Sequence, residues 1–303
     1  MASTDLARAG PGIAPAVAAL CASAVAMGIS PIFVRYAAAA DVGPFASAFW
    51  RVALALPVLY AWVRLDERGR ATPPGRPFGA ATLLAGLAFA GDLFFWHLSI
   101  LATTVANATF FATTAPVFVV LIAWAALRQR IAPATLAGLA LCLLGGLALV
   151  GQSSQVDPAR LRGDLYGVAT AFFFGLYFIA VGRARDSGAS AGRVTFELSL
   201  VTAAVLFGVA LASGDRVWPS SSGGWLALFA MAWVSHAGGQ GLLSVALGRL
   251  PPVFSSLVIF LEAIAGAAFG WALLGERVTA IQALGGALIL LGIWIARPRG
   301  AGP

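Results

Sequence analysis

Long apolar runs separated by short polar segments dominate the chain. A helix needs roughly 20 consecutive apolar residues to cross a bilayer. Ten runs come close to that length, at residues 12–35, 44–63, 78–98, 103–127, 133–151, 164–183, 192–213, 223–247, 251–274 and 279–296. The runs are continuous rather than alternating, which argues against a transmembrane β-barrel. The pattern therefore predicts an all-α polytopic membrane protein with ten transmembrane helices.

The composition agrees with this interpretation. Of the 303 residues, 60% are hydrophobic and only 10% are charged, whereas roughly a quarter of an average soluble domain is charged. The net charge is +7, but the basic residues are scattered between apolar runs, so we expect a lipid bilayer and no nucleic acid as a partner. Cys21 and Cys142 lie inside apolar runs without metal-site spacing and are expected to be core residues.

The basic residues indicate the topology. All nineteen are arginines, and with a cytoplasmic N-terminus thirteen of them fall on the inner side and six on the outer side. The positive-inside rule therefore favours both termini in the cytoplasm. The strongest marker is the loop that carries Arg64, Arg68, Arg70 and Arg76.

An internal repeat relates the two halves by a shift of 147 residues. Trp124 then coincides with Trp271, Arg130 with Arg277, and the pair Gly138 and Gly145 with Gly285 and Gly292. Each half holds five helices, and because five is odd the second half enters the membrane from the opposite side. Inverted repeats place a site near the midplane between the halves and indicate a transporter. The alternative is a duplication that only enlarged the membrane domain.

Several segments resemble a known family. The run Leu261-Glu262-Ala263 through Trp271 to Glu276, followed by residues 285–292, is similar to the second EamA repeat of the drug/metabolite transporter superfamily. Phe49-Trp50-Arg51 and the segments 115–130 and 138–145 resemble parts of the first repeat. The expected division is a first repeat at 1–151, a connector at 152–163 and a second repeat at 164–303. Ala263 departs from a proline that is frequent in the family, which puts a fixed kink in the ninth helix in doubt.

The resemblance implies a ten-helix basket that exports small metabolites. Bacterial members include exporters of amino acids, aromatic ones among them, which implies the bacterial inner membrane and an amino-acid exporter. A multidrug or cation transporter and a transporter of sugar-like metabolites are the alternatives within the fold. A membrane-embedded enzyme or a sensor is the alternative outside transport.

Four charged residues fall within predicted spans, where a charge costs on the order of 3 kcal/mol and needs a partner or a function. Asp92 and Glu262 are candidates for the substrate cavity. Arg51 and Glu197 are candidates for a gate or a charge pair. For each of them, a purely structural ion pair is the alternative.

Further candidates are polar or helix-breaking residues inside the spans. The cavity candidates are Ser30, Trp96, Asn107, Thr113, Tyr177, His236 and Gln240, and the hinge candidates are Pro31, Pro116, Gly238 and Gly239. Trp96 lies four residues after Asp92, and Gln240 four after His236, so each pair shares a helix face. The alternatives are a lipid anchor for Trp96, hydroxyl bonds to the backbone for the threonines, and a helix–helix hydrogen bond for His236.

Motifs of enzymes are absent from the sequence. There is no GxSxG, HExxH or P-loop motif, so we expect no enzyme activity, no ATP, no metal and no cofactor. The expected partner is a small-molecule substrate, and the chain is expected to act as a monomer. Coupling to protons and facilitated diffusion both remain open.

Overall fold

The computed structural model describes residues 13–68, 77–103, 105–150, 161–214, 216–275 and 277–298. The topology markers Arg8, Arg70, Arg76, Arg160 and Arg299 lie outside the described residues, as does Glu276.

The first half of the chain forms five spans, three of which consist of two helical segments. In chain order, its helices are α1 (Ile13–Gly28), α2 (Ser30–Ala39), α3 (Pro44–Ala53), α4 (Leu56–Asp66), α5 (Ala80–Ala102), α6 (Val105–Thr113), α7 (Ala115–Ala125) and α8 (Pro133–Val150). The pairs α1–α2, α3–α4 and α6–α7 each make one span.

The second half also forms five spans. Its helices are α9 (Leu161–Asp186), α10 (Ala191–Ser213), α11 (Ser222–Ala230), the π-helix η3 (Met231–Gln240), α12 (Gly241–Leu247), α13 (Pro252–Val258), α14 (Leu261–Leu274) and α15 (Ala280–Ala296). The segments α11, η3 and α12 form one span, and α13 and α14 form another.

The predicted spans are confirmed. Within the described residues, nine helices of at least 18 residues are apolar enough to cross a membrane, and α15 adds a shorter apolar helix. Large apolar side chains point outward along them, such as Leu226, which is 72% exposed, and Trp124, which is 63% exposed. Such exposure suits a lipid environment rather than water.

Prolines account for three of the breaks within spans. The breaks before α2, α4 and α7 each have a proline at the start of the following helix, namely Pro31, Pro57 and Pro116. Proline lacks the amide proton and clashes with the preceding turn. The ninth span is broken at Ile259–Phe260 without such a proline. The span is therefore interrupted even though Ala263 stands where the family frequently has proline. The shift of 147 residues places Thr114 on Leu261. The break in the ninth span therefore lies near the counterpart of the break at Thr114.

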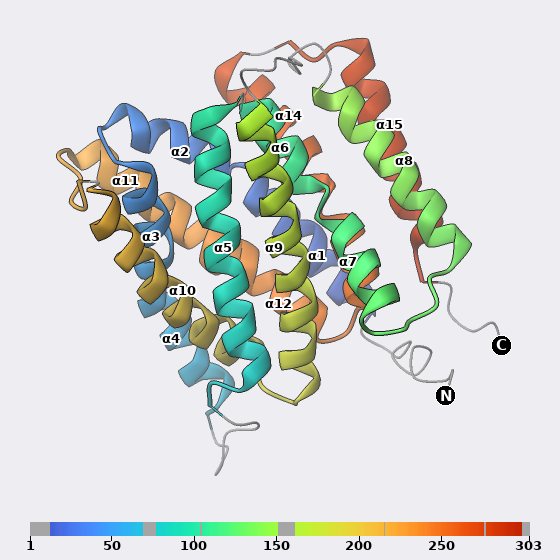
Figure 1. Cartoon of the computed structure of the whole chain (residues 1–303), viewed down its shortest axis with the longest axis horizontal. Coiled ribbons are helices and arrows are strands. Elements are labelled where there is room, and N and C mark those ends of the chain that lie inside the picture. The colour runs from blue at the N-terminus through green and yellow to red at the C-terminus, as the bar shows by residue number, and fades with distance from the viewer. Residues whose placement is uncertain are drawn as a thin grey trace.

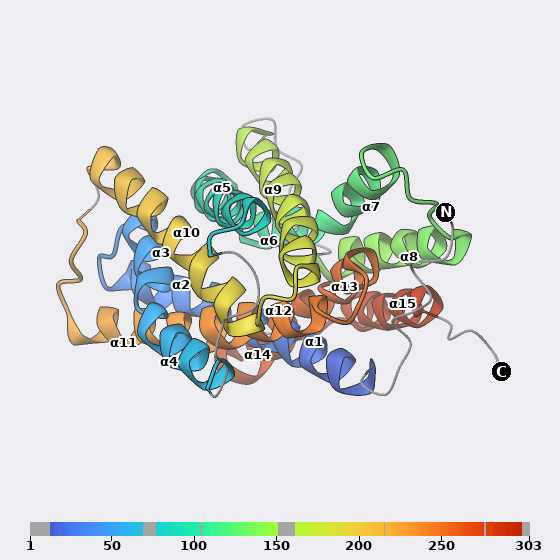
Figure 2. The same cartoon turned by 90° about the horizontal axis from the view of Figure 1, so that it is seen from below.

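The helices α8 and α15 pack directly against each other at one end of the long axis, whereas α2, α3, α4 and α11 lie at the other end (Figure 1, Figure 2). Gly138 faces Gly292 and Gly145 faces Gly285, so the two helices run antiparallel. Cys142 and Ile289, which are repeat counterparts, meet at the centre, where the Cys142 thiol lies 3.6 Å from the Ile289 carbonyl oxygen. Because counterpart helices run in opposite directions around this point, the repeat is inverted.

The packing of α8 on α15 yields a stability prediction. A Cβ atom at Gly145 would lie 2.5 Å from the Gly285 carbonyl oxygen, whereas one at Gly208 on α10 meets nothing within 4 Å. Gly145→Ala should therefore lower the free energy of unfolding by about 1–3 kcal/mol through overpacking. The matched control Gly208→Ala should be neutral or slightly stabilising, because alanine favours helix.

Thermal unfolding of the purified variants in detergent checks this prediction. A Gly145→Ala protein as stable as the Gly208→Ala protein would contradict the tight crossing of α8 and α15.

Candidate functional site

The buried guanidinium of Arg51 on α3 lies at the centre of the candidate site. It is within electrostatic range of Asp92 on α5, Glu262 on α14 and Tyr177 on α9, and it also acts on His236 in η3. Arg51 and Asp92 are 5% and 7% exposed, whereas Glu262 is partly exposed. We call Arg51, Asp92, Tyr177, His236 and Glu262 the central cluster.

The two repeats contribute jointly to the central cluster. Arg51 and Asp92 come from the first half, and Tyr177, His236 and Glu262 come from the second. Charges buried in a membrane protein are stable only when they are paired or solvated. Arg51 therefore holds carboxylates from both halves through electrostatic attraction.

An aromatic stack forms one side of the central cluster. The Phe89 ring lies between Tyr177, at a centroid distance of 5.0 Å, and His236, at 5.4 Å. His236 Nε2 lies 2.8 Å from the Ser199 hydroxyl oxygen, which fixes the ring against α10. His236 Nδ1 and the Tyr177 hydroxyl are buried and have no hydrogen-bond partner within the described residues.

The π-helix η3 carries two of the cavity candidates, His236 and Gln240. π-Helical turns are rare and frequently occur at functional sites. The Gln240 amide donates to Met27 Sδ at 3.2 Å, while Gln240 Oε1 has no partner in the described part of the chain. Gly239 lets α1 approach closely, since a Cβ there would lie 2.6 Å from Met27 Cγ, and its carbonyl accepts the Ser23 hydroxyl at 2.7 Å. The hinge candidates Gly238 and Gly239 thus lie within the irregular turn.

Two helix breaks lie close to Glu262. Glu262 is in the first turn of α14, directly after the break in the ninth span. A Cβ on Gly28, at the end of α1, would lie 2.8 Å from the Glu262 carbonyl oxygen. Ser30 begins α2 just beyond, and its buried hydroxyl has no partner among the described residues. Discontinuous helices that meet in this way are typical of transporter binding sites.

Unpartnered buried polar atoms occur in and around this region, and also elsewhere in the described structure, for example at Ser255 and Arg193. Within the described residues they include side-chain atoms of Ser30, Ser47, Arg51, Tyr177, Ser235, His236 and Gln240. Most buried polar groups in proteins are hydrogen-bonded, and exceptions need an explanation such as water or a ligand. A polar ligand bound at the central cluster would supply the missing partners.

Three cavity candidates make other contacts. The Asn107 amide donates to Asp164 Oδ1 at 3.2 Å, and the Thr103 hydroxyl donates to the same oxygen at 2.8 Å. These bonds join the α5–α6 connection to the start of α9. The Thr113 hydroxyl donates to the Phe110 carbonyl at 2.8 Å. This is the hydroxyl–backbone bond that was the alternative to a place in the cavity. Trp96 is buried, one helical turn after Asp92, with its ring edge-on to His97.

Glu197 is part of a separate ion-pair network where α4 ends and α10 begins. Its carboxylate accepts the Phe78 amide at 2.8 Å and lies 3.4 Å from Arg193 Nε. Arg193 also lies 3.3 Å from Glu67. The two residues considered for a gate or charge pair therefore have different partners, since Arg51 interacts with the central cluster and Glu197 with this network.

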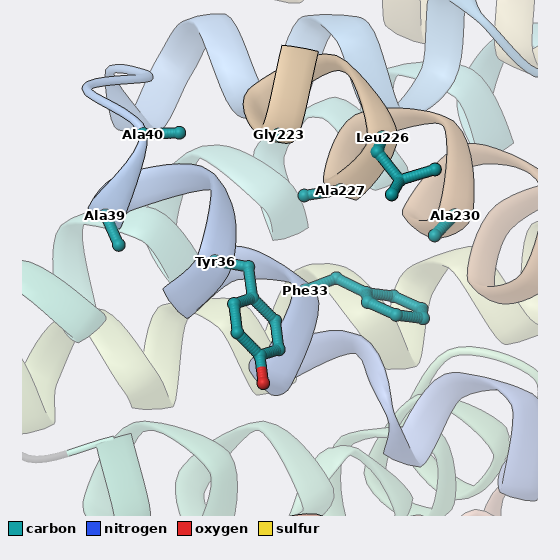
Figure 3. A pocket seen from close by; sticks show the side chains of 8 residues that line it. All are labelled: Phe33, Tyr36, Ala39, Ala40, Gly223, Leu226, Ala227 and Ala230. Carbon is teal, nitrogen blue, oxygen red and sulfur yellow. The ribbon is translucent and has the colours of Figure 1, made fainter. Parts of the chain in front are cut away.

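An apolar groove lies between α2 and α11 (Figure 3). Its volume is about 490 Å³, and its lining residues are Phe33, Tyr36, Ala39, Ala40, Gly223, Leu226, Ala227 and Ala230. None of the candidate residues lines it. Such an apolar surface suits lipid chains rather than a polar substrate.

Several residues of the site, among them Phe89, Ser199 and Ser47, were missed by the sequence interpretation. Phe89 lies three residues before Asp92 and thus on the same helix face, so the spacing could have revealed it. Ser199, the partner of His236, gives no comparable signal because it comes from a different span.

Comparison with known proteins identifies the family. The profile of the EamA-like transporter family matches twice, at residues 14–151 and 161–297. The chain belongs to the EamA-like transporter family. This membership and the apolar spans of the described residues make it a multi-pass membrane protein.

Two further similarities accompany this match. An uncharacterized transporter of Archaeoglobus fulgidus is 30% identical over 141 residues, which are 46% of this chain and 48% of the relative. The match thus spans about half the length of that curated relative. A solved crystal structure with 20% identity superimposes with a TM-score of 0.79 over 93% of this chain and 97% of that chain. At this identity the likeness supports the fold alone.

The unpartnered Tyr177 hydroxyl leads to a second prediction about stability. Tyr177→Phe removes a buried oxygen that has no partner in the described structure, so the free energy of unfolding should stay the same or rise. Ser199→Ala removes the partner of His236 Nε2 and should lower it by about 1–3 kcal/mol.

Thermal unfolding of both variants in the same detergent tests this contrast. A larger loss of stability in Tyr177→Phe than in Ser199→Ala would mean that the tyrosine hydroxyl has a structural role.

Proposed function

We propose that this EamA-like transporter exports amino acids, aromatic ones among them, and related small metabolites, with the central cluster as the substrate site. The observation that carries the proposal is a buried guanidinium that interacts electrostatically with two carboxylates, one from each repeat. A zwitterionic amino acid carries both complementary charges.

The groups of an amino acid match the groups of the cluster. Arg51 Nε and the Ser47 hydroxyl, one turn apart on α3, have no partners among the described residues and suit a substrate carboxylate. Asp92 and Glu262 suit the ammonium group. The stack of Tyr177, Phe89 and His236 offers an aromatic surface for the substrate side chain.

The mechanism that we propose is alternating access. Several spans are interrupted, with Pro31 and Pro116 at two breaks and Gly238 and Gly239 in η3, whereas α5 and α9 are continuous. These positions are candidate hinges, because interrupted helices bend where backbone bonds are missing. We further propose a location in the bacterial inner membrane with both termini in the cytoplasm, and action as a monomer without ATP.

An exporter of cationic compounds is the second candidate. Two carboxylates outnumber the single guanidinium of the cluster, and this excess of negative charge favours cations. An exporter of cations would release organic cations that lack a carboxylate at least as well as amino acids.

Counterflow in proteoliposomes tests the proposed function. Vesicles loaded with unlabelled phenylalanine should accumulate labelled phenylalanine faster than protein-free vesicles. Asp92→Asn and Tyr177→Ala should each lower this rate at least tenfold, because the first removes the charge and the second the aromatic ring that we assign to the substrate. Asp186→Asn, which changes an exposed carboxylate at the end of α9, is the control and should match the unmodified protein.

Two results would contradict the proposal. If no labelled amino acid enters faster than in protein-free vesicles, amino-acid transport is wrong. If transport occurs and both site variants match Asp186→Asn, the substrate binds elsewhere.

A further inference from the structure

The central cluster is closed off toward one end of the bundle, which we call the inner end. At the inner end α9 and α12 end, and α10 and α13 begin. Here α9 packs against both α12 and α13 (Figure 2). Apolar side chains of these three helices, each at most 6% exposed, fill the space between the cluster and the inner end, namely Phe178, Val181, Leu243, Phe254 and Val258. This apolar layer excludes water from that side of the cluster.

The repeat counterparts of these helices are packed more loosely at the opposite end. The shift of 147 residues places Phe178 on Pro31 and Val181 on Val34. Phe178 and Val181 are completely buried, whereas Pro31 and Val34 are partly exposed. The helix α2, which carries the latter two, also packs less closely on α5 and α6 than α9 packs on α12 and α13. The structure is therefore the conformation in which the cluster is closed at the inner end.

Arg185, in the last turn of α9, joins α9 to α12 at the inner end. Its Nε donates to the Ser244 carbonyl of α12 at 3.0 Å, and its Nη1 donates to the Ala189 carbonyl in the turn before α10. The Gly248 amide bonds to the Val245 carbonyl, so the Ser244 carbonyl is one of the terminal groups of α12 that lack a helical partner. An arginine is favoured at this position, because it bonds the free carbonyl and complements the negative end of the helix dipole.

Neighbouring residues provide the space and the charge that this guanidinium needs. A Cβ atom at Gly248 would lie 2.5 Å from Arg185 Nη2, so the missing side chain leaves room for the guanidinium. Asp66, the last residue of α4, is its strongest electrostatic partner. The Asp66 carboxylate also accepts the Gly192 amide of α10 at 3.2 Å. Arg185 is thus linked to the first repeat as well as to α12.

On the basis of the proposed alternating access, we propose that Arg185 is the latch of the inner end: its bond to Ser244 holds α9 against α12 and must break before a substrate passes between the cluster and the inner side. The repeat counterpart of Arg185 is the exposed Ala38, whose methyl group cannot donate a hydrogen bond. The counterpart of Gly248 is Leu101, which is 64% exposed. The opposite end therefore lacks this latch at the corresponding position, and at rest the chain favours closure at the inner end.

The labelling of an introduced cysteine reports the opening of the inner end. Val181 is completely buried and lies four residues before Arg185, hence on the same face of α9. In the full chain in detergent, Val181→Cys should react with a water-soluble maleimide no faster than the parent chain, in which Cys21 and Cys142 set the baseline. Combining it with Arg185→Gln should raise the labelling rate roughly tenfold or more, because the inner end is open for a larger share of the time.

Further variants in the Val181→Cys chain separate a latch from general support of the fold. Gly248→Ala should also raise the labelling rate, because its methyl group displaces the guanidinium and leaves the arginine in the chain. Arg185→Lys should label more slowly than Arg185→Gln, because an ammonium group can still donate to the Ser244 carbonyl. The matched control is Arg183→Gln, which removes an exposed arginine from the same turn of α9 and should leave the labelling rate unchanged.

Loss of stability is controlled separately. Gly145→Ala is expected to destabilise the crossing of α8 and α15, and it changes no group at the inner end. Its labelling rate should therefore stay at the level of Val181→Cys alone. If Gly145→Ala speeds labelling as much as Arg185→Gln does, labelling follows overall stability and the latch is wrong.

The remaining outcomes decide on Arg185 itself. If Arg185→Gln runs as a folded monodisperse protein in gel filtration and labels no faster than Arg183→Gln, the latch is overturned. If Arg185→Gln does not fold, Gly248→Ala decides: faster labelling supports the latch, and an unchanged rate overturns it. Labelling requires no substrate, so an absence of phenylalanine counterflow would overturn the proposed substrate and leave the result for the latch intact.

Discussion

The attraction between one buried guanidinium and two carboxylates is the interaction on which the centre of this protein depends. Arg51 belongs to the first repeat, and its partners Asp92 and Glu262 come from different repeats. Without Arg51, two acids would lie close together in a medium that penalises even one. Without the acids, a guanidinium would be buried alone. The same charges that link the two halves therefore also form the site that we propose for a charged substrate.

The two repeats share a topology, but they differ where the cluster forms. The first span is broken at Ile29, whereas its counterpart α9 continues without interruption and places the Tyr177 ring against Phe89. Conversely, α5 is regular, while the counterpart span contains η3 with His236. The site thus combines a regular and an irregular helix from each pair. In each pair, the continuous helix, α5 or α9, holds its cluster residue in place, and the interrupted counterpart span can bend.

Hydropathy and charge placed most of the fold, because the bilayer imposes a length and a polarity on every span. They also singled out Asp92, Glu262 and Arg51, since a charge in an apolar run is costly wherever it lies. The sequence did not show which residues on different spans contact each other. Nothing in the neighbourhood of Asn107 shows that Asp164 is its partner, and a break at Ile259–Phe260 without an adjacent proline has no local signal.

The π-helix was likewise not predictable, although its residues were noticed. The spacing of His236 and Gln240 was read as that of an α-helix, because Gly238 and Gly239 suggest flexibility without specifying a wider turn. The wide turn depends on contacts with α1, where Met27 packs on Gly239 and Ser23 binds its carbonyl. Such contacts join residues more than 200 positions apart, and only the folded chain brings them together.

The crossing of α8 and α15 has an evolutionary consequence. Gly138 and Gly145 meet Gly292 and Gly285, their counterparts in reversed order, and Cys142 meets its own counterpart Ile289. A contact surface that is complementary to its own inverted copy is the condition for a symmetric dimer. Two identical five-helix chains, inserted in opposite orientations, could pair through this face before any gene fusion. The contact between α8 and α15 meets this geometric condition within a single chain.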